Sequence, residues 1–310
     1  MRISTLQMHT AMNSSMQQAS GKINESLLKM LSGKEILKPS DDPLAALQIM
    51  GMSDDLTVLE QYQKNITSAQ SSLTAEETVL NDVDSTLNRL RDLTLSAGND
   101  ALSQEDMNAI AGEVDHLIGQ LSDMANTKSA NGEYLFAGTK SDTMPVVKKE
   151  FTDPDTGVVT EKWVYEGGDE SREIPISDNR TITQGDTADD IFFSADGGSI
   201  FADLDELSTA LKAGDRTALK DVLDGSIESI DKTLADVGST LTSVGARINT
   251  LDMTTTANEE SIAMTTALKG SLEDLDYAEA ITQLTLEQTA LQASQKSYGK
   301  VSQLSLFNYI

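Results

Sequence analysis

The feature that most constrains this chain is a heptad seam that begins at Leu59 and continues for five repeats. Apolar residues recur there in alternating steps of three and four, and the seam positions are Leu59, Tyr62, Ile66, Ala69, Leu73, Glu76, Leu80, Val83, Leu87, Leu90, Thr94 and Ala97. Only Glu76 and Thr94 are polar. Such a pattern predicts one long helix that packs against other helices as in a coiled coil. A helix of this length is longer than a compact small domain, so we expect an elongated protein.

Cap and turn signals predict further helices on both sides of the middle of the chain. Ala97-Gly98-Asn99-Asp100 is a turn signal, and Ser103 is a suitable N-cap for a helix that continues to Met124. Because the loop is short, this helix and the preceding one are expected to be antiparallel neighbours. Further helices are expected after about residue 199. The first ends at Gly214, and Asp215 caps the second. A third helix is expected from about Ser239 into the closing segment. The polar tract DMTTTANEES is expected to weaken that last helix locally.

A stretch with strand character separates the two helical halves. Asn131-Gly132 favours a hairpin-type turn, and the YLFAG that follows is strand-like. MPVVKKEFTD and VVTEKWVYEG flank the turn DPDTG and predict a hairpin, and REIPISDNRTITQGD continues with strand and turn signals. We therefore expect a β-rich insert domain at 134–198, which contains the single tryptophan, Trp163.

The order of helices, insert and helices predicts a mainly α protein with a small β insert. Neither helical half has a complete core, so the two halves are expected to form one elongated antiparallel coiled-coil-like helical bundle. Both termini would then lie at one end, and the β-rich domain would lie at the far end. The expected division is terminal segments at 1–42 and 268–310, a helical rod domain at 43–133 and 199–267, and the insert at 134–198.

The two terminal segments are thin amphipathic helices that look unable to fold alone. Exposed apolar stripes mark interaction surfaces, and a head-to-tail contact that does not close on itself builds a ring or a helical assembly. The candidate assembly residues are Met8, Met12, Met16, Ala19, Ile23, Leu27 and Met30 in the first segment, and Leu268, Leu272, Leu275, Ile281, Leu284, Leu291, Leu304, Leu306 and Phe307 in the last. The alternative is that these stripes only cover the bundle's own core.

Composition and charge narrow the classes of function. The 310 residues carry a formal net charge of −27, which argues against nucleic acid and anionic membranes as partners. Residues 1–40 run against this trend, with five Lys or Arg and two Glu; this positive tip could meet acidic neighbours, or it could be chance. No apolar run is long enough to span a bilayer. The N-terminus lacks the apolar core of a signal peptide, so export would need another route.

The chain shows no pattern for catalysis, for a metal or for a cofactor. There is no cysteine for a disulfide or a nucleophile, no glycine-rich phosphate loop and no G-x-S-x-G element. His9 and His116 lie in different segments, where surface or seam positions are the commoner role. We therefore expect that the protein is not an enzyme and needs no cofactor.

Three stretches resemble the flagellin family. SGKEILKPSDDPLAALQI at 32–49 resembles the conserved turn of flagellin-type proteins, and NGEYLFAGT at 131–139 resembles the start of their β domain. The closing SLEDLDYAEAITQLTLEQTALQASQKSYGKVSQLSLFNYI resembles the family's C-terminus. Within the family, the ILKPSDDPLAA and LSLFNYI forms favour the hook-associated branch that joins hook to filament.

The resemblance implies an extracellular structural protein of the bacterial flagellum, exported unfolded through the flagellar type III pathway without a cleaved signal peptide. It implies a ring of copies at the hook–filament junction, with the first hook-associated protein, flagellin and an export chaperone as partners.

The resemblance also gives a hinge role to Pro39, Ser40, Asp41, Asp42 and Pro43. Local chemistry alone explains this tract as an ordinary helix start, with Ser40 or Asp42 as N-cap and Pro43 at the first helical position.

Three alternatives remain open at this point. One is a flagellin-type filament subunit, and another is an adhesin-like binding protein that uses Trp163 and Tyr165 of the insert as stacking groups. The third is a signalling or secretion coiled coil, for which flagellin-like ends would not be expected at both termini.

Overall fold

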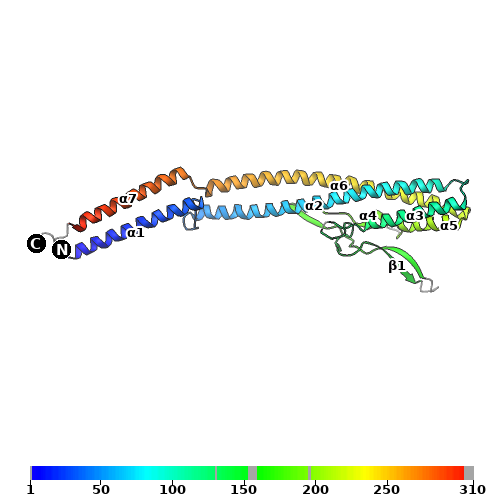
Figure 1. Ribbon diagram of the computed structural model, residues 1–310, viewed down its shortest axis with the longest axis horizontal. Coiled ribbons are helices and arrows are strands. Elements are labelled where there is room, and N and C mark those ends of the chain that lie inside the picture. The colour runs from blue at the N-terminus through cyan, green and yellow to red at the C-terminus, as the bar shows by residue number, and fades with distance from the viewer. Residues whose placement is uncertain (1, 130, 153–158, 195–196, 304–310) are drawn as a thin grey trace. The chain divides into compact units, whose positions relative to one another are not determined.

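The computed structural model describes residues 2–129, 131–152, 159–194 and 197–303. The chain divides into two compact units: unit 1 contains residues 1–58 and 260–310, and unit 2 contains residues 59–259. Two long helices, α2 (Pro43–Ala97) and α6 (Arg216–Glu273), contribute residues to both units (Figure 1). The prediction of a mainly helical protein with a small β insert is confirmed.

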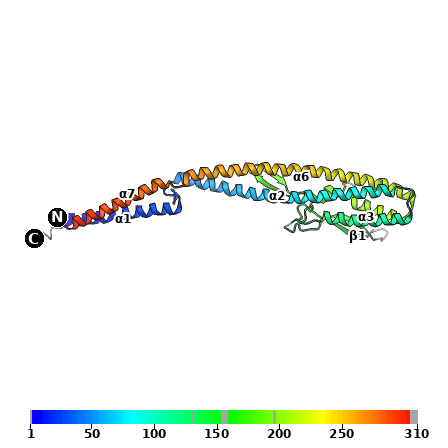
Figure 2. The ribbon, with the colours of Figure 1, turned by 45° about the horizontal axis from the view of Figure 1, so that its top comes forward.

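In unit 2, α2 and α6 lie side by side, as Figures 1 and 2 both show. Every heptad position of α2 from Ile66 to Ala97 is buried, including the two polar ones, so the predicted long helix is confirmed. Thr94 tolerates burial because its hydroxyl donates to the carbonyl of Leu90 at 2.7 Å. The other polar seam residue, Glu76, has partners in the insert.

Helix α6 is continuous from Arg216 to Glu273, so the prediction of a separate helix near Ser239 is wrong. The polar tract DMTTTANEES lies within α6 and is helical. The buried positions of α6 continue at heptad spacing. Because polar residues occupy several of them, a pattern of apolar residues alone does not reveal this seam. The buried residues of α6 are Leu219, Leu223, Ser226, Ile230, Thr233, Val237, Val244, Leu251, Thr254 and Asn258.

The predicted caps in unit 2 are confirmed. Helix α3 (Gln104–Ala125) starts after Ser103, whose hydroxyl accepts the N–H of Asp106 while the Asp106 carboxylate accepts the N–H of Ser103. The Asp106 carboxylate also accepts from the Ser103 hydroxyl at 2.7 Å, and the bonds that it accepts from this hydroxyl and from the Ser103 N–H lower the pKa of Asp106. Arg89 of α2 pairs with Glu113 of α3 at 2.6 Å, as expected for antiparallel neighbours. Helix α5 (Ile200–Ala213) ends at Gly214, which has a φ of 72°.

The insert contains two separate two-stranded antiparallel sheets. Strand β1 (Val146–Thr152) pairs with β2 (Val159–Tyr165), which confirms the predicted hairpin. Strand β3 (Glu173–Ser177) pairs with β4 (Arg180–Thr183), which confirms the strand and turn signals of REIPISDNRTITQGD. The turn DPDTG lies outside the described residues.

The prediction of a strand at YLFAG is wrong. Tyr134 makes one isolated bridge to Lys128, and the residues after it form turns. Phe136 is fully buried, and its carbonyl accepts the N–H of Ala188 at 2.9 Å. Gly138 has a φ of 58°, which favours a turn over a strand. This segment therefore fills the core and has no partner strand.

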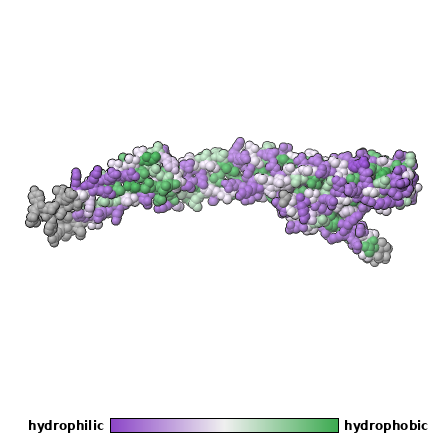
Figure 3. Space-filling model, viewed as in Figure 1, coloured by the Kyte–Doolittle hydropathy of each residue, from purple (hydrophilic) through white to green (hydrophobic). Residues whose placement is uncertain are grey.

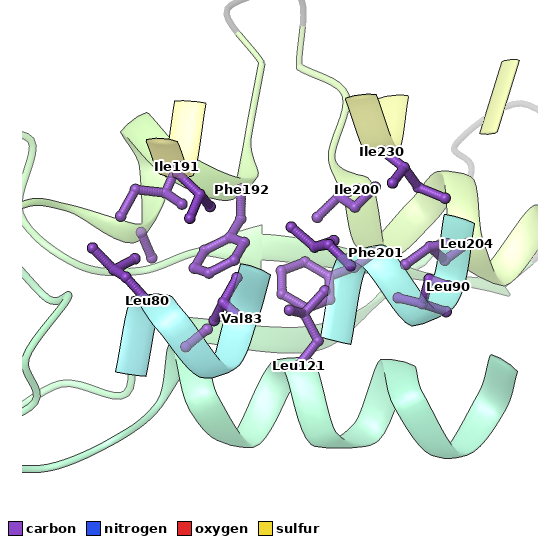
Figure 4. Close-up of a cluster of buried hydrophobic side chains, with 14 of the residues drawn as sticks. Leu80, Val83, Leu90, Leu121, Ile191, Phe192, Ile200, Phe201, Leu204 and Ile230 are labelled. Carbon is purple, nitrogen blue, oxygen red and sulfur yellow. The ribbon is translucent and has the colours of Figure 1, made fainter. Parts of the chain in front are cut away.

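One part of the core of unit 2 lies where the insert meets the helices (Figure 4). Phe192 of the short helix α4 (Ala188–Phe192) and Phe201 of α5 are buried with ring centroids 5.6 Å apart. Trp163 of β2 packs against Phe201 at 4.9 Å. Residues from α2, α3 and α6 close the cluster, among them Leu80, Val83, Leu90, Leu121 and Ile230. The few aromatic residues of the chain are thus concentrated at this junction.

Candidate assembly surface

Unit 1 is built on an antiparallel pair of helices, α1 (Arg2–Ser32) and α7 (Tyr277–Gln303). Near the start of α1, Nδ1 of His9 lies 3.3 Å from the Tyr298 hydroxyl. Further along, the Ser26 hydroxyl donates to Glu287 at 2.9 Å, and the hydroxyl of Tyr277 donates to the carbonyl of Met30 at 3.2 Å. Residues that are nearly 300 positions apart in the sequence therefore lie next to each other.

A joint of backbone hydrogen bonds ties the two ends of the chain together. The carbonyl of Gly33, which ends α1 with a φ of 71°, accepts the N–H of Leu275 at 3.0 Å. The N–H of Glu35 donates to the carbonyl of Glu273 at 2.8 Å, and Leu275 is buried. Asp276 then caps α7 by accepting the N–H groups of the next turn. The prediction of one continuous helix from about Ser239 into the closing segment is therefore wrong at this point, because α6 ends at Glu273 and α7 begins at Tyr277.

The seam between α1 and α7 is shallow. Half-buried predicted residues face it from both helices: Met12, Met16, Ala19, Ile23 and Met30 from α1, and Leu284 and Leu291 from α7. Among the described side chains of these two helices, none is fully buried. A hollow of about 250 Å³ lies in the seam, where Met12 and Met16 face Ala293, Ser294 and Ser297. A pair with so little buried surface depends on other contacts for its stability.

Large apolar side chains gather on the outside of unit 1. Leu31 is 83% exposed, and Leu44 and Leu47 at the start of α2 are each 68% exposed. We call the whole set the unit 1 apolar surface: Met8, Leu27, Leu28, Leu31, Leu44, Leu47, Met50, Val58, Met264, Leu268, Tyr277, Ile281 and Leu286. Figure 3 shows apolar residues gathered where α1 ends and α7 begins. Folding of a single chain leaves this surface uncovered, as at an interaction site.

The structure divides the predicted assembly residues among several places. Met8, Leu27, Leu268 and Ile281 belong to the unit 1 apolar surface. The seam residues face the partner helix, Leu272 is half-buried in α6, and Leu275 lies in the joint. Leu304, Leu306 and Phe307 lie outside the described residues.

Sequence reasoning missed Leu44, Leu47 and Met50 of this surface. These three residues precede the heptad seam that begins at Leu59, and the apolar residues that follow Pro43 were the signal available for finding them.

The tract from Pro39 to Pro43 forms the start of α2. Asp42 is the N-cap, because its carboxylate accepts the N–H groups of Leu44 at 3.0 Å and Ala45 at 3.1 Å. Pro43 is the first helical residue, as predicted. Of the two predicted caps, Asp42 occupies the position and Ser40 does not. The Asp41 carboxylate accepts the N–H of Lys38 at 2.9 Å and so closes the preceding turn. A hinge role for these five residues stays a prediction.

Comparison with known proteins identifies the family. The model of the bacterial flagellin N-terminal helical region matches residues 3–141, and that of the flagellin C-terminal helical region matches residues 227–310. Flagellar hook-associated protein 3 of Escherichia coli K12 is 30% identical over 297 residues, which cover 90% of each chain. This chain belongs to the flagellar hook-associated protein 3 family. It therefore has a structural role in the flagellum.

Other family members support the assignment. Flagellar hook-associated protein 3 of Salmonella typhimurium LT2 is 27% identical and covers 99% of each chain. The crystal structure of flagellar hook-associated protein 3 from Legionella pneumophila has a TM-score of 0.62, with 20% identity, over 72% of this chain and 98% of that chain. The fold is thus the one that this family shares.

Two of the basic residues among the first 40 positions form ion pairs within unit 1. Lys29 pairs with Glu35 at 2.6 Å, and Lys34 pairs with Glu273 across the joint. Exposed pairs of this kind contribute about 1 kcal/mol or less. Lys29 and Lys34 are two of the five positive charges for which acidic neighbours were one possible partner, and both are paired within the chain.

Metal and membrane sites were also considered for the residues that the structure describes. Within that part of the chain, no group of His, Asp and Glu side chains could hold a metal ion, and no helix is apolar enough to cross a membrane. Trp163 packs on Phe201, and its Nε1 donates to the Asp205 carboxylate at 2.8 Å. Tyr165 packs against Phe193. These aromatics belong to the junction of insert and helices, which argues against the adhesin-like alternative.

Proposed function

We propose that this chain is a structural subunit at the junction between the flagellar hook and the filament, where copies of it assemble through unit 1. The observation that carries the proposal is the unit 1 apolar surface, which a folded single chain leaves exposed. Complete burial of one leucine side chain contributes about 1.5–3 kcal/mol. A set of such residues, covered by neighbouring subunits, is sufficient to stabilise an ordered ring.

In this proposal one set of residues makes contacts within the chain, and another makes contacts between subunits. The seam residues Met12, Met16, Ile23, Leu284 and Leu291 hold α1 against α7 within one chain. The unit 1 apolar surface contacts the neighbouring subunits. In the assembled flagellum these neighbours are further copies of this chain, the first hook-associated protein and flagellin. Before assembly, an export chaperone covers the same exposed leucines and prevents premature contact between chains.

The division of the chain follows from the same proposal. Residues 1–42 and 268–310 are the terminal assembly segments, 43–133 and 199–267 form a helical domain, and 134–198 form the insert. The tract from Pro39 to Pro43 acts as the hinge between the first segment and the helical domain. The protein works outside the cell, as a part of the flagellum.

A comparison of two shortened chains tests the proposal in cells that lack the native copy. Removal of residues 268–310 is expected to abolish filament attachment, because α7 and one side of the joint are lost. The matched control shortens the β1–β2 hairpin by joining Lys149 to Lys162, which are partners in the strand register. Trp163 and Val146 remain in place, so the core is kept. Filament attachment and the amount of exported chain are measured for both.

The two shortened chains give opposite results if unit 1 is the assembly module. The hairpin variant should retain most of its filaments, and the chain without 268–310 should be made but carry none. Normal filaments on cells that carry the chain without residues 268–310 would overturn the proposal.

A further inference from the structure

An acidic side chain, Glu76, is buried in the α2 seam where the insert meets the helix. It is 1% exposed. Its Oε1 accepts the N–H of Asp186 at 3.1 Å, and its carboxyl group lies against that of Asp186. Asp186 follows strand β4 by only a few residues. The seam position that interrupts the apolar pattern is therefore a contact to the insert.

Asp186 is bound from the other side by a second helix. Arg247 of α6 forms an ion pair with the Asp186 carboxylate and also donates to the carbonyl of Thr183 at 3.3 Å. Gln184 Nε2 reaches the Ser72 hydroxyl of α2 at 3.2 Å. The segment from Thr183 to Asp186 is thus held to α2 and α6 through polar side chains, beside the hydrophobic core.

The charges in this cluster do not balance if both carboxyl groups are ionised. Two carboxylates would then face one guanidinium in a site with little access to water, and an unpaired buried charge is costly. Burial and the neighbouring Asp186 raise the pKa of Glu76 to about 8, although Arg247 acts in the opposite direction. A protonated Glu76 can donate to the Asp186 carboxylate, so one shared proton completes the cluster.

The other charged groups around the site leave this balance unchanged. Arg172 and Glu133 line the same cavity and pair with each other at 3.1 Å, and Arg172 also donates to Gln184 at 2.8 Å. The cavity has a volume of about 40 Å³ beside Glu76 and Asp186. It is large enough for a water molecule, so a proton can be exchanged there without unfolding of the core.

We propose that Glu76, Asp186 and Arg247 form a proton-dependent latch that fastens the β insert to α2 and α6. With the proton present, Glu76 donates to the Asp186 carboxylate, Arg247 pairs with the same carboxylate, and the segment 183–187 is held. When the proton leaves, the two carboxylates repel each other and the segment loosens. The insert is therefore attached less firmly in alkaline solution, while the aromatic cluster around Phe201 stays packed.

The raised pKa of Glu76 determines whether the free energy of unfolding increases or decreases with pH. Between the ordinary pKa of a glutamate, about 4.3, and the value of about 8 in the folded chain, the folded state binds one proton more than the unfolded state. The free energy of unfolding then decreases as pH rises through this range and levels off above it.

The test uses Glu76→Gln in the full chain. A glutamine keeps the shape, accepts the N–H of Asp186 and donates to its carboxylate, but it cannot ionise. The melting temperature and the amide hydrogen exchange of residues 183–187, corrected for the intrinsic exchange rate, are followed from about pH 5 to pH 10. In the native chain we expect exchange in this segment to rise about tenfold or more across the transition. In Glu76→Gln we expect protection to persist and the melting temperature to fall less.

Two further variants keep the proposal falsifiable. Glu77→Gln changes the adjacent, less buried carboxylate and should follow the native chain. Asp186→Asn removes the carboxylate that would repel an ionised Glu76. Whatever its protection at pH 5, the further loss of protection between pH 5 and pH 10 should be much smaller in this variant than in the native chain, and a loss as large as the native one would contradict the latch. Equal pH dependence in the native chain and Glu76→Gln would overturn the proposal.

Discussion

Leu47→Asp is expected to prevent incorporation of the chain into flagella and to leave the folding of the free chain unchanged. Leu47 is 68% exposed in unit 1, so an aspartate there remains in water and costs little. In the assembled structure the same carboxylate would be covered by a neighbouring subunit, and burial of an unpaired charge costs several kcal/mol. Isolated hook–filament complexes should contain native chain and no variant, while thermal unfolding of the two purified proteins coincides within error.

Leu95→Asp is the matched control for this prediction. Leu95 lies on the same helix, α2, and is 50% exposed, but it belongs to unit 2. The control should assemble as the native chain does. If Leu47→Asp were incorporated normally, or if both variants failed equally, the assignment of assembly to unit 1 would be wrong.

Phe201→Ala is expected to produce the largest loss of folding stability among single substitutions in unit 2. The Phe201 ring is fully buried and lies 4.9 Å from Trp163, 5.6 Å from Phe192 and 6.2 Å from Phe193. Truncation removes the ring's transfer energy and leaves a cavity, which together cost about 3–5 kcal/mol. Denaturant unfolding followed by tryptophan fluorescence measures the loss directly, because Trp163 is the single tryptophan.

Phe151→Ala provides the comparison within the insert. Phe151 of β1 is 44% exposed, and its removal should change the free energy of unfolding by about 0.5 kcal/mol or less. A small effect of Phe201→Ala, similar to that of Phe151→Ala, would show that the aromatic cluster does not join the insert to the helices.

The parts of the fold that could be predicted are those in which the local pattern and the tertiary burial coincide. Helix α2 has apolar residues at nearly every buried heptad position from Ile66 to Ala97, so its period reveals its seam. The α3 N-cap at Ser103 and the two hairpins of the insert depend on neighbours within a few residues. Local chemistry determined these features.

Other parts depend on residues distant in the sequence. The break between α6 and α7 is stabilised by bonds from Gly33 and Glu35 to residues 273–275, more than 230 positions away. In α6, Ser226, Thr233, Thr254 and Asn258 are buried at seam positions, and composition alone gives no reason to expect this. Glu76 appeared as a polar interruption of the seam because its partner, Asp186, and the Arg247 that pairs with Asp186 lie in parts of the chain far away in the sequence.

The candidate surface was predictable in its location and less so in its residues. The terminal segments were identified from their thin apolar stripes, but periodicity cannot distinguish a residue that faces the partner helix from one that faces outward. Met12 and Met8 belong to one predicted stripe, yet Met12 lies in the seam and Met8 on the surface. The exposed Leu44 and Leu47 follow Pro43, outside both predicted stripes.

Direct localisation of the chain in intact flagella tests the central claim, that this protein is a junction subunit. The chain contains no cysteine, so Lys220→Cys, at an exposed position of α6, provides a single site for a gold label. We expect the label in one narrow band between hook and filament. Label distributed along the whole filament, or absent from the flagellum, would contradict it.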